Sequence, residues 1–420
     1  MATIAQTIAA NFKQAIFLIL ILAGAPSAQA QSVVDVIASG TPLADLRLRY
    51  EAIELTTKTK AASAATLRAR LGYQTGLYAG FQGFAEIDIV QHFGPQHFND
   101  TLNGLTAYPA IPDPDLVALN RLQLGYALHL ARNGDAPADL KLTVGRQRII
   151  YGDARFIGNA GWRQHEQTYD AISLSDSSLP NTVLSYAYVA RVNRIFGPRS
   201  PNADFNSHSH LFNAINSGVP HAKLEAYAYL LDLRQAPLLS TATYGMRAES
   251  AFDLGSGIIA IANGAFARQQ DYARNPLHIG LSYYLAEAGL TYAKFSGLVG
   301  YEVLQGNGTT GFQTPLASLH LFQGWAETFV VNPPNGVRDF YAKGNYALPP
   351  PPFLTRLTAS FAYHDFSAEH VGKHYGDEWD AQLEAQAGPA LIFDVAYAAY
   401  RSDAPFPGKN GFWCYATYRY

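Results

Sequence analysis

The residues best suited to bind an anion are concentrated between Gly145 and Asp170, in "GRQRIIYGDARFIGNAGWRQHEQTYD". Four arginines lie here among four glycines, although charged residues make up only 15% of the chain. Guanidinium groups stay charged and hold carboxylates through paired hydrogen bonds. The stretch therefore predicts either a site for anions or the polar part of a chain otherwise built for an apolar medium. Its arginines are Arg146, Arg148, Arg155 and Arg163.

Other residues with catalytic or metal-binding chemistry form no recognisable site. His208 and His210 in "HSH", and the stretch 370–378, have spacings that a metal ion can use, but neither implies a third ligand. The sequence contains neither H-E-x-x-H nor G-x-S-x-G. Ser360 and His364 lie on the same face of their expected strand, and we expect this face to point to a lumen rather than to a lipid leaflet. We therefore predict no enzyme activity, no catalytic residue, no metal ion and no cofactor.

The start of the chain predicts an export signal. Lys13 precedes an apolar run from Ala15 to Ala25, and "SAQA" offers a cleavage site that ends at Ala30. We expect a signal peptide over residues 1–30 and one domain over 31–420. No later stretch reaches the eighteen apolar residues that a membrane-spanning helix needs. The mature chain is therefore soluble, or it spans a membrane as a barrel.

Many segments of about ten residues alternate apolar side chains with polar or small ones, as strands with one apolar face do. "LRARLGYQT", "RLQLGYALHL", "HAKLEAYAYL", "FLTRLTASFAYH" and "WDAQLEAQA" are examples. A secreted β-sandwich also alternates, but the last strand, "FWCYATYRY", favours a membrane barrel. It places Phe412, Cys414, Tyr418 and the final Tyr420 on one face, as in the closing strand of outer-membrane proteins. Cys414 is then expected to face lipid as an inert thiol.

Chain length and composition set the size of the barrel. About 390 mature residues at roughly ten per strand, plus turns and loops, predict an all-β, antiparallel transmembrane barrel of about 18 strands (16–18). We expect a water-filled lumen partly closed by loops. The proline run in "LPPPPF" (348–353) marks a turn or rim, because proline lacks the N–H that a paired strand requires. A net charge of -3 gives no general attraction to nucleic acid.

The polar face of these strands carries both positively and negatively charged side chains. The inward cations that we expect to line a pore are Arg68, Arg70, Lys223, Arg247 and Arg356. Their expected acidic partners in the lumen are Asp153, Glu86, Asp88, Glu225, Asp380 and Glu384. Rings of arginine or lysine favour anions in a pore. The alternative is a ladder of mutual salt bridges that only keeps the interior charges paired.

The stretch from Gly145 resembles the alginate export family of outer-membrane barrels. Further stretches add to the match: "YAYVARVNRIFGP", "SHLFNA", "YAYLLDL", "GFQTPLASLHLFQGWAETF", "YHDFSAE" and "YGDEWDAQ". The resemblance implies a monomeric barrel that passes an anionic polysaccharide through a positively lined pore. It also implies that Arg191 and Arg194 belong with the four arginines of the first stretch. The acidic residues of the same parity distinguish this chain from that pattern.

The alternation through Leu140, Leu142 and Val144 would place Arg146 in lipid. Either the strand leaves the bilayer at Gly145, or a glycine bulge there turns Arg146 and Arg148 inward. The glycines that follow allow a bent segment that folds into the lumen as a constriction, with Trp162 as an anchor. The alternative is an exterior loop.

The leading hypothesis for function is passive diffusion of an anionic or polyhydroxylated solute: an alginate-like polysaccharide, an oligosaccharide or an organic acid. A general porin with weak charge preference is the alternative, and an outer-membrane enzyme or adhesin is a third. The expected location is the Gram-negative outer membrane after cleavage near Ala30. The expected partners are outer-membrane lipid, the barrel assembly machinery and the solute, with no nucleic acid.

Overall fold

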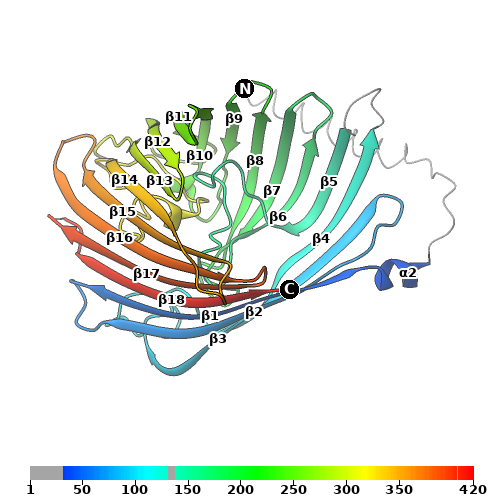
Figure 1. Cartoon of the computed structure of the whole chain (residues 1–420), viewed down its shortest axis with the longest axis horizontal. Helices are drawn as coiled ribbons and strands as arrows, with labels where there is room; N and C mark the ends of the chain where they lie inside the picture. Colours follow the sequence, from blue (N-terminus) through cyan, green and yellow to red (C-terminus); the bar gives the residue numbers. More distant parts are fainter. Residues whose placement is uncertain (1–31, 131–137, 404) are drawn as a thin grey trace.

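The computed structural model describes residues 32–130, 138–403 and 405–420, which form one closed antiparallel β-barrel (Figure 1). The first strand pairs with both the second and the last, so the sheet has no free edge. The predicted all-β barrel of about 18 strands is therefore confirmed. The predicted signal peptide lies outside the described residues. The elements are α2 (Val33–Ala38), β1 (Thr41–Leu55), β2 (Ala62–Gln74), β3 (Phe81–His97), β4 (Leu116–Leu130), β5 (Ala138–Gln147), β6 (Thr168–Asp176), β7 (Thr182–Asn193), β8 (Asp204–Asn216), β9 (Ala222–Leu230), the 3-10 turn η1 (Pro237–Leu239), β10 (Thr241–Asp253), β11 (Ile258–Asp271), β12 (Gly280–Tyr292), β13 (Phe295–Leu304), the 3-10 turn η2 (Leu319–Leu321), β14 (Val337–Leu348), β15 (Arg356–Ser367), β16 (His374–Ala387), β17 (Leu391–Ser402) and β18 (Lys409–Arg419).

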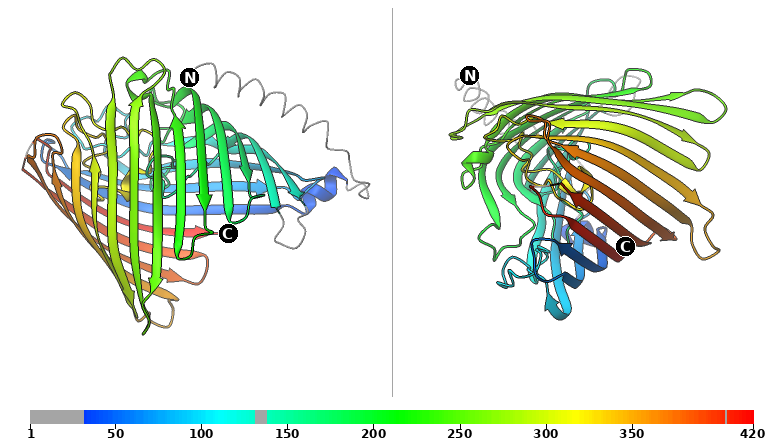
Figure 2. Two further views of the ribbon diagram at one scale, coloured as in Figure 1. Left: turned by 90° about the horizontal axis from the view of Figure 1, so that it is seen from above. Right: turned by 90° about the vertical axis from the view of Figure 1, so that its left-hand side faces the viewer.

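The two ends of the barrel differ in their connections (Figure 2). One end has short turns such as 293–294 and 388–390, and the backbone of α2 is bonded there to the β2–β3 turn. The other end has the long connections 98–115, 148–167 and 305–336. Outer-membrane barrels place short turns in the periplasm and long loops outside. We therefore call the two ends the short-turn end and the outer end.

The outward face is apolar and the inward face is charged. Along β1, Leu46, Leu48 and Tyr50 are exposed on the outside, whereas Arg49 and Glu51 are buried inside. A cation on the lipid face costs about 2–4 kcal/mol at the bilayer midplane, which explains this separation by parity. Cys414 is exposed on the outward face, as expected. Among the described residues, no helix has the length and apolar character needed to cross a membrane.

The strand register shifts at four places on the described wall, at Ala64, Asn120, Ala190 and Tyr375. Register passes from Glu86–Arg121 to Ile87–Leu119, which leaves Asn120 as an unpaired insertion in β4. Another shift leaves Ala190 unpaired in β7, between Val189 and Arg191. Each bulge bends its strand locally. The sequence reading placed no bulge at any of these positions.

Gly145 carries no such shift, which corrects one expectation. β5 pairs continuously with β4 and β6 through this residue, although its φ is 118°. Parity therefore does not switch, and Arg146 lies opposite Leu122, which is exposed on the outer face. The strand instead reaches its end at Gln147. Arg148 then lies beyond the strand, in the connection that enters the lumen.

Two connections fold into the barrel, and their traces cross the interior in Figure 1. These are the 148–167 segment, between β5 and β6, and the 305–336 segment, between β13 and β14. They meet at a β-bridge between Ile157 and Leu316, where the Gly158 N–H donates to the Leu316 carbonyl at 2.8 Å. Ile157, Leu316 and Phe312 are at most 1% exposed. The lumen therefore has an apolar core of its own, built by the two segments together.

Gly145→Ala is expected to destabilise the barrel, because an added Cβ would lie 2.3 Å from the Leu122 carbonyl oxygen. A strained positive φ at a residue other than glycine adds roughly 1–3 kcal/mol. Gly264→Ala in β11 is the matched control, since its added Cβ would come no closer than 3.7 Å. The urea midpoint of the folded species on unheated gels measures the effect. Equal midpoints for both variants would contradict this explanation of Gly145.

Candidate functional site

The carboxylate of Glu166 fixes the 148–167 segment to the barrel wall. Glu166 is fully buried, and Arg148 donates to it from Nε at 2.8 Å. Asn120 from β4 and Asn159 from the segment donate at 2.8 and 2.6 Å, and the Arg70 guanidinium lies at 3.6 Å. Burial opposes ionisation of this carboxyl, but Arg70 and Arg148 outweigh it and hold its pKa below the usual value. The carboxylate is therefore a charged link between segment and wall.

A second link joins both inner segments to β13. Arg155 is 1% exposed, and its Nε donates to Glu302 Oε1 at 2.7 Å. Gln323 from the 305–336 segment donates to the other oxygen of Glu302 at 3.1 Å. Burial opposes the charge on Arg155, but Glu302 outweighs it and raises the pKa of the guanidinium. One wall carboxylate thus positions a residue from each segment.

Backbone amides attach the 305–336 segment to β16. The Ala326 N–H donates to Glu378 Oε1 at 2.6 Å, and the Trp325 N–H donates to Asp380 at 3.3 Å. Gly324 has a φ of 78°, and a Cβ there would lie 2.4 Å from Glu378. The sequence reading placed Asp380 in the lumen but did not identify this segment as part of the constriction. The sequence marks this segment only through "GFQTPLASLHLFQGWAETF", a stretch that contributes to the family resemblance.

An aromatic stack joins the tips of the two segments. The Trp162 ring lies on the His320 ring with centroids 3.6 Å apart and planes 7° apart. The Arg49 guanidinium covers the Trp162 ring at 4.5 Å. Next to the stack, Arg163 donates to Glu51 at 3.3 Å and also to Glu327. Trp162 is therefore an anchor, as the sequence suggested.

Beside this stack is a cavity of about 580 Å³. Three cations reach it: Arg163, Arg194 and Lys409. Arg194 lies over the rings of Phe196 and Phe205 at 4.7 and 4.3 Å. Much of the remaining wall is apolar, formed by Ile53, Ile195, Phe196, Leu319, Leu321, Val330 and Val331. The cavity can take a small molecule that has an anionic end and an apolar body.

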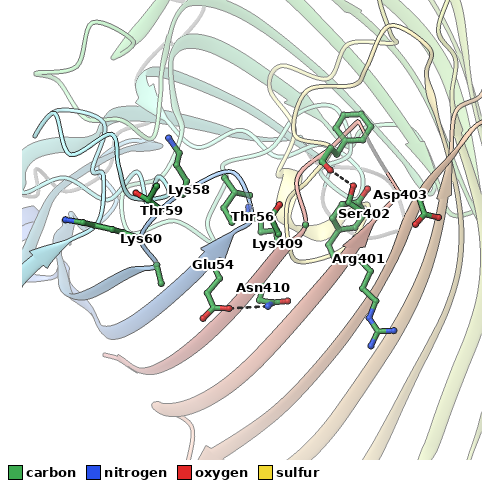
Figure 3. Close-up of a pocket in the computed structure, with 15 residues that line it drawn as sticks. Glu54, Thr56, Lys58, Thr59, Lys60, Arg401, Ser402, Asp403, Lys409 and Asn410 are labelled. Atoms are coloured by element: carbon green, nitrogen blue, oxygen red, sulfur yellow. Dashed lines mark hydrogen bonds between the residues drawn. The ribbon is translucent and has the colours of Figure 1, made fainter.

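A second cavity, of about 890 Å³, opens at the outer end between the β1–β2 and β17–β18 connections (Figure 3). Lys58 and Lys60 lie on one side of it and Arg401 on the other. Lys409 lines both this mouth cavity and the inner one. The two spaces therefore share one cation.

Two of the predicted pore arginines lie on the outer face instead. Arg146 donates to Asp170 at 2.7 Å on the lipid-facing parity. Arg191 lies opposite Asp170 and pairs with Asp204 at 3.4 Å, and its side chain is 45% exposed. Both pairs lie at the ends of their strands nearest the outer loops. Their charges are balanced outside the lumen.

The other predicted lumen charges lie inside and are largely paired with one another. On β1 to β4, Arg68 bonds Asp45, Arg70 bonds Asp88, and Glu86 accepts from Arg121. Arg247 bonds Asp153 from the 148–167 segment and also Glu249, and Glu249 pairs with Lys223. Arg356 bonds Glu384, and Glu225 accepts from Asn213. The sequence left two interpretations of these residues, a pore lining that favours anions and a ladder of mutual salt bridges. The salt bridges describe this set. The cations that line a cavity are fewer than the sequence suggested.

Comparison with known proteins identifies the fold and no family. No protein-family description matches the chain, and no curated protein matches it in sequence. Among solved structures, the chain is similar to Pseudomonas aeruginosa OpdO (TM-score 0.68, 13% identity, covering 93% of this chain and 99% of that one) and to Acinetobacter baumannii OccAB2 (0.68, 15%, 92% and 99%). It is also similar to P. aeruginosa OpdK with vanillate (0.64, 13%, 92% and 99%), a protein described as an outer membrane protein. At these identities the likeness shows the barrel fold.

Glu166→Gln is expected to release the 148–167 segment while the barrel stays folded. Removing one partner of a buried charge cluster costs roughly 3–5 kcal/mol. Amide hydrogen exchange within 148–167 should therefore speed up by at least tenfold, with little change in the strands. Asp204→Asn, at the outer-face pair with Arg191, is the control. Unchanged exchange in the Glu166 variant would show that this carboxylate does not hold the segment.

His320 predicts a pH-dependent step in ion selectivity. Burial lowers the pKa of its imidazole from 6.5, although Glu327 at 3.2 Å acts in the opposite direction. The ring is therefore neutral at pH 7 and gains a positive charge only as the pH falls below 6.5. Anion preference should then rise on acidification, and this rise should be smaller in His320→Asn. Reversal potentials at pH 7.5 and 5 measure it, and identical rises in both proteins would rule out His320 as the group responsible.

Proposed function

We propose that the chain is a passive outer-membrane channel for small organic acids with an apolar body. The observation that carries the proposal is the inner cavity, where Arg163, Arg194 and Lys409 share one space with an apolar wall. Its volume of about 580 Å³ lies within the range of small-molecule sites. Two carboxylates, Glu51 and Glu327, also line it, so cations outnumber anions by one. A weak excess of positive charge suits passage, because a solute must bind and then leave.

The shared position of Lys409 suggests a route. An anion would enter the mouth cavity near Lys58, pass Lys409 and reach Arg163 and Arg194. Guanidinium groups are suited to holding its carboxylate along this path. OpdK, which has the same fold, was solved with vanillate, an aromatic carboxylate. Movement would follow the solute gradient.

We rank two alternatives, a polysaccharide channel and a general porin, below a channel for small organic acids. An alginate-like polysaccharide is what the family resemblance implies, but a polymer would have to displace the 148–167 and 305–336 segments, which meet at Ile157 and Leu316. A general porin with weak charge preference would use the same lumen without binding. We also propose, from the sequence, a monomer placed in the outer membrane by the barrel assembly machinery after cleavage near Ala30.

Arg194→Gln and Arg191→Gln form a matched pair that tests the proposal. Arg194 lines the inner cavity, whereas Arg191 lies on the outer face. A unit charge about 4 Å from an ion in water contributes about 1 kcal/mol, so the anion-to-cation permeability ratio should fall roughly fivefold in Arg194→Gln. Block of the current by benzoate should weaken with it. Arg191→Gln should match the wild type.

Planar-bilayer recordings in a potassium chloride gradient measure both effects. If the two variants behave alike, the inner cavity does not select anions. Equal permeability to potassium and chloride in the wild type, with no block by benzoate, would support the general porin. Block by oligouronates but not by benzoate would support the polysaccharide.

A further inference from the structure

The outward face of β11 carries an arginine that has no acidic partner among the described residues. Arg268 is exposed and donates to Ser282 Oγ at 2.9 Å. Within the described part of the chain, no carboxylate lies at ion-pair distance from it, unlike Arg146 and Arg191 on the same outer face. An unpaired guanidinium beside lipid is unfavourable unless it meets water or an anion. No described residue supplies that anion, so a ligand from the membrane can.

Arg268 stands at one end of an apolar groove on the outside of the barrel. The groove has a volume of about 750 Å³ and spans β6 to β11. The small residues of its floor are Ala214, Ala226 and Ala228, and its larger apolar residues include Phe212, Tyr244, Met246 and Phe266. β11 runs from the short-turn end to the outer end, so Arg268 is the β11 lining residue nearest the outer loops. One carboxylate, Asp176, also lines the groove, but it is the last residue of β6 and lies toward the short-turn end, at the other end of the groove from Arg268. An apolar channel with a cation at its outer end fits an acyl chain with an anionic head.

Cross-strand register places Arg268 near the polar boundary of the membrane face. One continuous row of paired residues runs from Phe212 through Ala228 and Tyr244 to Arg268. Beyond this row on β8, the next outward side chains are His210 and then His208. They bond the hydroxyls of Tyr186 and Tyr188 at 2.9 and 2.7 Å. Polar pairs thus replace apolar side chains above the row, which is the pattern expected at headgroup level.

We propose that this groove binds one acyl chain of a phosphorylated lipid of the outer leaflet, with the Arg268 guanidinium on its phosphate. Phosphate oxygens match the guanidinium fork, and the long loops place this end of the barrel in the outer leaflet. The distribution of charge favours a phosphate here rather than on the other side of the barrel, at the outer end of β15 to β17. There Asp365 and Asp403 flank His374, at 3.3 and 2.6 Å. Carboxylates at that rim repel a phosphate.

The test is native mass spectrometry of the purified full chain in detergent, titrated with bis-phosphorylated lipid A. Arg268→Gln should weaken binding roughly tenfold, because it removes a charge-assisted hydrogen bond. Ala228→Trp should weaken binding by filling the groove. Arg274→Gln, in the exposed β11–β12 loop, is the matched control and should bind as the wild type does. Conductance and ion selectivity should be unchanged in Arg268→Gln, so this test is independent of the proposed solute.

Four outcomes would overturn the proposal. The first is equal binding of lipid A by the wild type and by Arg268→Gln. The second is equal binding of the wild type to lipid A stripped of both phosphates, which would show that the phosphate is not recognised. The third is a dimer in place of bound lipid, which would assign this face to a second copy of the chain. The fourth is competition with the lipid by millimolar inorganic phosphate, which should not occur and would indicate a free-phosphate site instead.

Discussion

The ion cluster around Glu166 is the interaction on which the lumen depends. It joins Arg148 of the 148–167 segment to Arg70 and Asn120 of the wall. Together with the Arg155–Glu302 pair, it holds the segment whose tip carries Trp162 and Arg163 beside the inner cavity. The cluster is possible because alternation in a closed sheet directs the charged side chains of the membrane-spanning wall into the interior, except near the strand ends. Charged side chains of the wall that cannot face lipid can instead bind the connections that enter the lumen.

The same constraint explains why few arginines are free to meet a solute. An unpaired buried charge is costly, so most inward cations have a carboxylate partner. Arg155, for example, is used to bind Glu302 and join two segments. The cations that line the inner cavity stand at its border with apolar residues, as Arg194 does over Phe196 and Phe205. Ion selectivity in such a lumen depends more on where the cations lie than on how many there are.

Much of the wall could be predicted from the sequence, because side chains alternate with a period of two along every strand. The apolar face of β1 and the outward position of Cys414 follow from this rule alone. The rule fails where an inserted residue shifts parity without a glycine or proline to mark it, as at Asn120 and Ala190. The rule held at Gly145, where the expected glycine bulge is absent despite a positive φ, and Arg146 therefore stays on the outward parity.

The lumen was harder to predict, because its contacts join residues far apart in the chain. Arg155 and Glu302 are 147 positions apart, and nothing local to either residue indicates the other. The inward fold of the 148–167 segment was foreseeable as one of two alternatives, from its glycines and arginines. The partner segment at 305–336 is less charged, and its role depends on backbone amides that donate to Glu378 and Asp380. Backbone donors leave no signal in residue types.

We propose that two inner segments build a cation-lined cavity in which a small carboxylate binds. An experimental structure of the purified barrel with benzoate tests it most directly. We predict the carboxylate within hydrogen-bond distance of Arg163, Arg194 or Lys409, with its ring against the apolar wall. A lumen without the 148–167 segment, or benzoate bound only outside this cavity, would contradict the account.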